Sequence, residues 1–288
     1  MATRRKSPRK KKDPEPTGIE PIDRLASLDP CVISNYIVAV SAYVREQRGL
    51  AAGPKKAAQI RLSNALGRAL LHDLKAKLPS LAGAIVGERK VAGALRTTNA
   101  DVSETNELDG LRLAIELKPV NLAVGRAIWN RFGDLRTFAV NLHLKFPFAV
   151  VGGVLVIPTY EEVGSKDAIE AEQAEAEVAE KGDSSELAAD LDREPISAVP
   201  PGVEPSPVSH LPSQRPTRHL IDRAVKRLIR AGGRETEADA AHLLEGISVV
   251  AYDPNTGQIE SDVPPVGSGL RWDEFISNLA KAYEARFE

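Results

Sequence analysis

The sequence has almost no cysteine and no long apolar run. Cys31 is the only cysteine among 288 residues, which excludes an internal disulfide and any zinc site built from cysteines. No apolar stretch approaches the roughly 20 residues that a membrane-spanning helix needs. The basic N-terminus is not followed by the apolar segment of a signal peptide. We therefore expect a soluble, cytoplasmic protein without a membrane partner.

Net charge is also small, at −2, but this sum conceals two strongly charged segments. Residues 1–12 hold seven Lys or Arg and no acid, whereas residues 161–194 hold thirteen Asp or Glu and three basic residues. Residues 1–17 are therefore interpreted as a disordered basic arm. Such an arm could bind a polyanion or could only keep the chain in solution, and the sequence leaves both readings open.

Residues 18–163 have the pattern of an α/β core. Leucines four residues apart, followed by Pro79, predict a helix over 55–78. Alternating apolar residues from 111 to 120 predict a strand. The other expected elements are a helical stretch at 31–44, strands at 91–95 and 100–105, a turn at 108–110, a helix at 122–145 and a buried strand at 148–157.

Residues 164–217 interrupt this pattern. Their first part is acidic, and their second part holds seven prolines between Pro195 and Pro216, so we predict a disordered linker. Residues 218–288 are expected to complete the same α/β domain, because the helix at 218–230 would cross between two apolar strands of one sheet. The expected elements are helices at 218–230 and 236–245, a strand at 246–252, a turn at 253–257 and a helix at 272–287.

The chemistry is expected on the hairpin from Asp101 to Lys118. Glu116 and Lys118 are two residues apart on a strand, so their side chains point to the same face. Asp101 precedes Glu116 by fourteen intervening residues and lies on the strand expected to pair with it. Two carboxylates and an amine suit Mg²⁺, phosphate oxygens and an attacking water. As a plain ion pair, Glu116 and Lys118 would contribute little.

This pattern resembles the PD-(D/E)XK nuclease superfamily, whose signature is an Asp on one strand and an acid-x-Lys sequence on the next. The resemblance implies a restriction-endonuclease-like mixed central sheet flanked by helices. It also implies that Asp101 and Glu116 are metal ligands and that Lys118 orients or deprotonates water. Asp101 follows Ala100 where the family has Pro. Asp109, in the apparent turn, remains an alternative first ligand, and an assisting acid could come from Glu46 or Glu88.

The helix at 122–145 carries four candidate DNA-binding residues. They are polar or basic side chains suited to phosphate contacts: Asn130, Arg131, Arg136 and His143. Arg131 could instead pair with Asp134 three residues later, and His143 could be an ordinary structural histidine.

The resulting hypothesis is a Mg²⁺-dependent deoxyribonuclease of restriction or phage-defence type. Its partners would be double-stranded DNA, a second copy of the chain, and a cognate DNA methyltransferase acting separately. The alternative is a catalytically inactive nuclease-like module that binds DNA or protein.

Overall fold

The central element is a mixed sheet whose six strands have the order β1-β2-β3-β4-β7-β8. The computed structural model describes residues 16–81, 83–121, 123–163 and 213–288. Strands β1, β2 and β3 are antiparallel neighbours, whereas β3, β4 and β7 run parallel. The strands are β1 (Ile85–Ala92), β2 (Thr97–Asn106), β3 (Gly110–Pro119), β4 (Val150–Pro158), β7 (Gly246–Asp253) and β8 (Gln258–Ile259).

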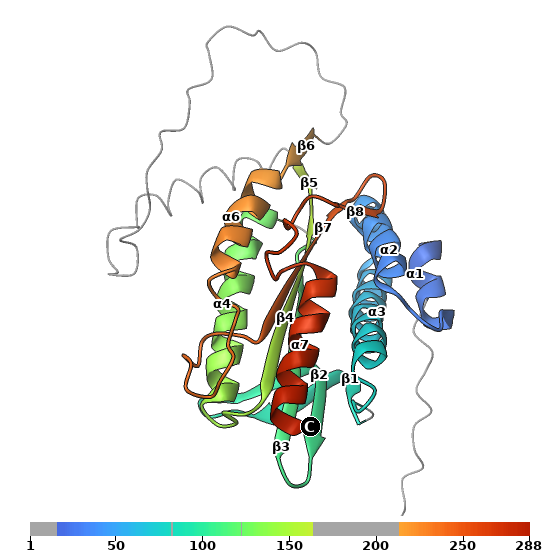
Figure 1. The fold of residues 1–288 in the computed structure, drawn as a ribbon. Helices are drawn as coiled ribbons and strands as arrows, with labels where there is room; N and C mark the ends of the chain where they lie inside the picture. The colour runs from blue at the N-terminus through green and yellow to red at the C-terminus, as the bar shows by residue number, and fades with distance from the viewer. Residues whose placement is uncertain (1–15, 82, 122, 164–212) are drawn as a thin grey trace, which may run out of the picture. The chain divides into compact units, whose positions relative to one another are not determined.

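Helices cover both faces of this sheet (Figure 1). One core joins the sheet to α1, α2, α3 and α7, and the other joins it to α4 and α6. The helices are α1 (Glu20–Arg24), α2 (Ile33–Glu46), α3 (Ala52–Lys77), α4 (Val124–His143), α6 (Arg218–Leu228) and α7 (Trp272–Phe287). The expected α/β architecture, with a mixed sheet between helices, is confirmed.

Strand β4 is buried along its whole length, as its apolar sequence predicts. Two glycines let helices approach it from both sides. A Cβ on Gly153 would lie 2.7 Å from Leu135 of α4, and one on Gly152 would lie 3.2 Å from Leu279 of α7. The Gly-Gly pair therefore serves helix–sheet packing.

The described residues up to Tyr160 and from Pro216 onward form one compact unit, and the described residues 161–163 and 213–215 belong to a second. The prediction of a linker reaching residue 217 is wrong at its end, because β6 (Ser213–Pro216) pairs with β5 (Tyr160–Val163). The basic arm up to residue 15, and the predicted linker over 164–212, lie outside the described residues.

The helix predicted at 236–245 is absent, and the segment forms turns. The Asp239 carboxylate accepts hydrogen bonds from the backbone amides of Glu235 and Thr236. These bonds stabilise a local turn in competition with a helix. The first hairpin strand also differs, since β1 covers 85–92 where 91–95 was expected. Within the described part of the chain, no helix combines the length and apolarity that crossing a membrane requires.

Candidate active site

The candidate site lies where the hairpin of β2 and β3 opens into a fork. The two strands pair from Asn106 and Gly110 up to Val102 and Ile115, and the pairing ends there. Beyond that point β3 continues along β4, while β2 continues along β1. Asp101 and Glu116 are the next residues on the two strands, so the opening begins at them.

Asp101 is held inside this fork by the backbone of β3. Its Oδ2 accepts a hydrogen bond of 2.7 Å from the amide of Leu117, the residue between Glu116 and Lys118. On the neighbouring strand, the register of β1 shifts between Val86 and Arg89, opposite this position. Asp101 also lines a cavity of about 440 Å³ against α3.

Glu116 and Lys118 share the opposite face of β3, as the strand period predicts. The Lys118 Nζ lies 2.5 Å from Oε1 of Glu116, and the two side chains are 20% and 12% exposed. The second oxygen of Glu116, Oε2, is buried and has no hydrogen-bond partner in the described structure. A buried carboxylate oxygen without a hydrogen bond destabilises the folded protein unless a cation or a hydrogen-bond donor contacts it.

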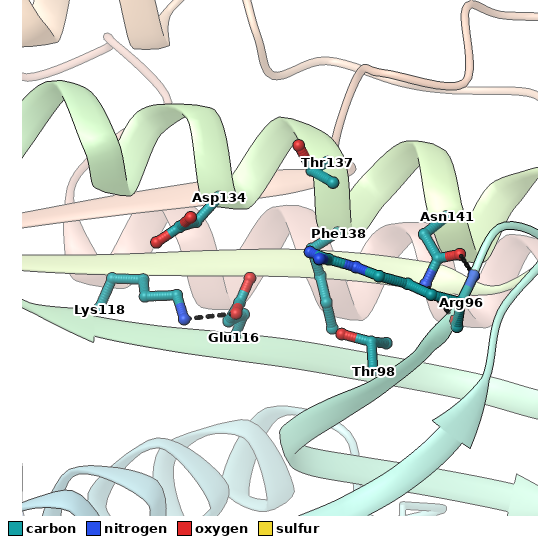
Figure 2. Close-up of a pocket in the computed structure, with 8 residues that line it drawn as sticks. All are labelled: Arg96, Thr98, Glu116, Lys118, Asp134, Thr137, Phe138 and Asn141. Carbon is teal, nitrogen blue, oxygen red and sulfur yellow. Dashed lines mark hydrogen bonds and ion pairs between the residues drawn. The ribbon is translucent and has the colours of Figure 1, made fainter.

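Glu116 and Lys118 line a second cavity, of about 150 Å³, between β3 and α4. Figure 2 shows Asp134 of α4 above Glu116, and Arg96 reaching in from the segment before β2. The remaining lining residues are Thr98, Thr137, Phe138 and Asn141. Asp101 and Glu116 thus line cavities against opposite helical layers, and the Leu117 amide lies at the junction.

Both fork carboxyls have a raised pKa. For Glu116, burial raises the pKa most, and the charges of Asp101 and Asp134 raise it further, against the hydrogen bond and charge of Lys118. For Asp101, burial raises the pKa and Glu88 adds to it, against the Leu117 amide and Lys118. Negative charge at the fork is therefore incompletely compensated by the protein itself.

The Glu116 carboxylate fits a divalent cation, and Asp101 lies near enough for its charge to raise the pKa of Glu116. Glu116 has a free buried oxygen, and a cation would relieve the unfavourable ionisation of both carboxyls. Within the described ranges, no group of three or more His, Cys, Asp or Glu side chains is arranged to hold a metal. One or two carboxylates are enough for Mg²⁺, which retains water and takes phosphate oxygens as further ligands.

The other acidic candidates are placed differently. Asp109 lies in the hairpin turn, where its Oδ2 accepts a hydrogen bond from Nε of Arg112. Gly110 and Glu116 are six positions apart on β3, about 20 Å of strand, so Asp109 and Glu116 cannot share an ion. Glu88 lines the same cavity as Asp101, whereas Glu46 ends α2 and lines neither cavity.

The four DNA-binding candidates on α4 do not form one surface. Arg131 forms an ion pair of 3.0 Å with Asp134, which lines the cavity. Asn130 is four residues before Asp134 and therefore lies on the same side of α4. Arg136 is exposed and lies over the Phe132 ring, 5.9 Å from its centroid. Two residues from Asp134, Arg136 points to another side of the helix. None of the four candidates lines the cavity, and Arg131 reaches it only through its ion pair with Asp134.

His143 is a buried structural residue, so its predicted contact with DNA is wrong. Its Nε2 lies 3.2 Å from Oε2 of Glu245, and its Nδ1 lies 3.0 Å from the carbonyl oxygen of Ala241. Glu245 also accepts hydrogen bonds from Arg234 and Arg286. His143 is 3% exposed, and it joins α4 to the segment preceding β7.

Sequence reasoning missed the cavity residues outside the hairpin. Arg96, Thr98 and Asn141 converge there through packing of α4 over the strands. Spacing along α4 does place Asp134 and Asn141 seven residues apart on one stripe, which is the only sequence signal for them. Comparisons with protein-family models, with curated proteins and with solved structures found no match to this chain.

Proposed function

We propose that this chain is a Mg²⁺-dependent DNA endonuclease that hydrolyses phosphodiester bonds. The observation that carries the proposal is the strand fork. There the Asp101 carboxylate accepts a hydrogen bond from the amide of Leu117, which lies between the paired residues Glu116 and Lys118. The order of a hairpin, an acid-x-Lys strand, a polar-faced helix and a buried parallel strand further supports a restriction-endonuclease-like fold.

The residues of the fork have separate roles in this proposal. Asp101 and Glu116 would hold Mg²⁺, whose positive charge acidifies the attacking water and stabilises charge on the phosphate. Lys118, held beside Glu116, would orient that water for attack on the phosphate. Water and phosphate must meet at Lys118, and the cavity between β3 and α4 gives them room.

The expected substrate is double-stranded DNA, as in restriction or phage-defence enzymes. Cleavage of both strands requires two active sites, so the functional form would be a homodimer. A separately acting DNA methyltransferase would then protect the host sequence. Asn130 and Arg131, on the side of α4 that carries the cavity residue Asp134, are the α4 residues best placed to contact the backbone.

A plasmid assay tests the proposal. Supercoiled DNA is incubated with Mg²⁺ and wild-type protein, or with Lys118→Ala, Asp101→Ala or Asp109→Ala. We expect nicking by the wild type and by Asp109→Ala, whose altered residue lies in the distant turn. Loss of about 100-fold or more is expected for the other two. Equal nicking by all four proteins would remove the catalytic claim.

The close Glu116–Lys118 ion pair favours a second candidate, a nuclease-like binding module without turnover. In that case the pair is structural. The module would retain DNA in a salt-dependent manner but show no metal-dependent cleavage under any of the plasmid conditions.

A further inference from the structure

The polar groups of the cavity between β3 and α4 are separated along its length (Figure 2). Glu116, Asp134 and Lys118 gather at one end. Arg96 enters from the other end, beside Asn141, and its guanidinium extends past Thr98 and Phe138 toward Glu116. The fork residues account for the first end and leave the second without a role.

Strand geometry explains why Thr98 faces this cavity. Ala100 of β2 is fully buried in the core formed with α4 and α6. Thr98, two positions earlier on the same strand, points the same way, and Arg96 lines the cavity from the bend that precedes β2. The Arg96 guanidinium has no hydrogen bond or ion pair with any residue that the structure describes, although Glu116 and Asp134 line the same cavity.

Asn141 fixes the backbone from which Arg96 extends. Its Oδ1 accepts hydrogen bonds from the amides of Leu95 (2.8 Å) and Arg96 (3.0 Å), and its Nδ2 donates to the Arg96 carbonyl (2.8 Å). Asn141 is 1% exposed. The turn fits closely against this amide, since a Cβ on Gly93 would lie 2.3 Å from Nδ2 of Asn141.

We infer that Arg96 and Thr98 form a subsite for a phosphate group of the nucleic-acid backbone, adjacent to Lys118. The inference rests on the proposed function and names the part of the site that binds the phosphodiester. A planar guanidinium donates two parallel hydrogen bonds to phosphate oxygens, and the Thr98 hydroxyl adds a third donor. Because Asn141 holds the backbone, less freedom is lost when the phosphate binds.

Salt-dependent binding tests this subsite separately from turnover. A labelled 16-base-pair duplex is titrated by fluorescence anisotropy with Ca²⁺ in place of Mg²⁺, over a range of salt concentrations. The variants are Arg96→Ala, Arg96→Lys and, as a control, Arg24→Ala on α1 in the opposite helical layer. The contacts of Asn141 are to the Arg96 backbone, so the Arg96 substitutions keep them.

We expect Arg96→Ala to weaken binding about tenfold and to reduce the slope of log K against log salt by about one. Arg96→Lys should restore the slope but only part of the affinity, because an amine lacks the bidentate fork. Arg24→Ala should match the wild type. An unchanged slope and affinity in Arg96→Ala would overturn the subsite, as would a wild-type protein that does not bind the duplex.

The two proposals fail in distinguishable ways. If the wild type binds DNA, loses one unit of slope on Arg96→Ala and never cleaves, the phosphate subsite stands and the nuclease proposal falls. If the wild type cleaves plasmid while Arg96→Ala binds and cleaves equally well, the nuclease proposal stands and the subsite falls.

Discussion

The carboxylate of Asp101 accepts a hydrogen bond from the backbone amide of Leu117 across the open end of the β2–β3 hairpin. This bond bridges the two strands just beyond their last paired residues, Val102 and Ile115. It holds the Asp101 carboxylate beside Leu117, the residue between Glu116 and Lys118. The fork thus gathers two carboxyls and an amine from positions that are separated in sequence.

Replacing Lys118 by Met should abolish DNA cleavage and also lower stability. Loss of the amine leaves the Glu116 carboxylate, 12% exposed, without its cation. We expect the free energy of unfolding to fall by about 1–3 kcal/mol. In urea titrations the double variant Glu116→Gln/Lys118→Met should recover part of this loss. Strictly additive effects would show that the pair is not coupled.

Replacing Glu116 by Gln should stabilise the metal-free protein at neutral pH, by on the order of 1 kcal/mol. The pKa of Glu116 is raised, so the folded state binds its proton more tightly than the unfolded state, whose pKa is about 4.5. Ionisation therefore destabilises the fold as pH rises above 4.5 through the folded pKa. Denaturation at pH 7 and pH 4 should show a difference that shrinks at the lower pH. A less stable variant at pH 7 would contradict this account.

The buried Glu245 should show the opposite pH dependence. Burial alone would raise its pKa, but the hydrogen bond and charge of His143, the charge of Arg286 and the Val151 amide hold it below 4.5. Its contribution to stability is therefore present above pH 4.5 and lost as pH falls through the folded pKa. Glu245→Gln should cost about 3–5 kcal/mol at pH 7, by chemical denaturation. The exposed Glu284→Gln is the control, and equal stability of both variants would refute the prediction.

Replacing Asn141 by Ala should loosen the segment from Gly93 to Arg96. The amides of Leu95 and Arg96 and the Arg96 carbonyl would lose their partner, at a cost of about 1–3 kcal/mol. Hydrogen exchange at Leu95 and Arg96 should accelerate, while β4 remains protected. DNA binding should fall toward that of Arg96→Ala. Unchanged exchange at both amides would show that Asn141 does not hold this segment.

Much of the fold could be predicted from local patterns. The apolar run of β4, the leucine spacing of α3 and the alternation along β3 all correspond to elements of the structure. The pairing of β2 with β3 and the parallel strands β4 and β7 also agree with the sequence. These features follow from periodicity, which one sequence records directly.

The errors came from contacts that local patterns do not record. The helix expected at 236–245 is replaced by turns held by Asp239. His143 is bound to Glu245, 102 residues later. Arg96 and Asn141 meet only because α4 crosses the strands. The acid-x-Lys pattern could indicate Glu116 and Lys118 as site residues. The positions of the other residues that line the cavity depend on tertiary packing.

The central claim is that Asp101 and Glu116 together hold one divalent ion. Calorimetric titration of the metal-free protein with Mn²⁺ tests it directly, using wild type, Asp101→Asn, Glu116→Gln and Asp109→Asn. We predict one site per chain in the wild type and Asp109→Asn, and at least tenfold weaker binding in each of the other two. Equal binding by wild type, Asp101→Asn and Glu116→Gln, or no binding by the wild type, would contradict the account.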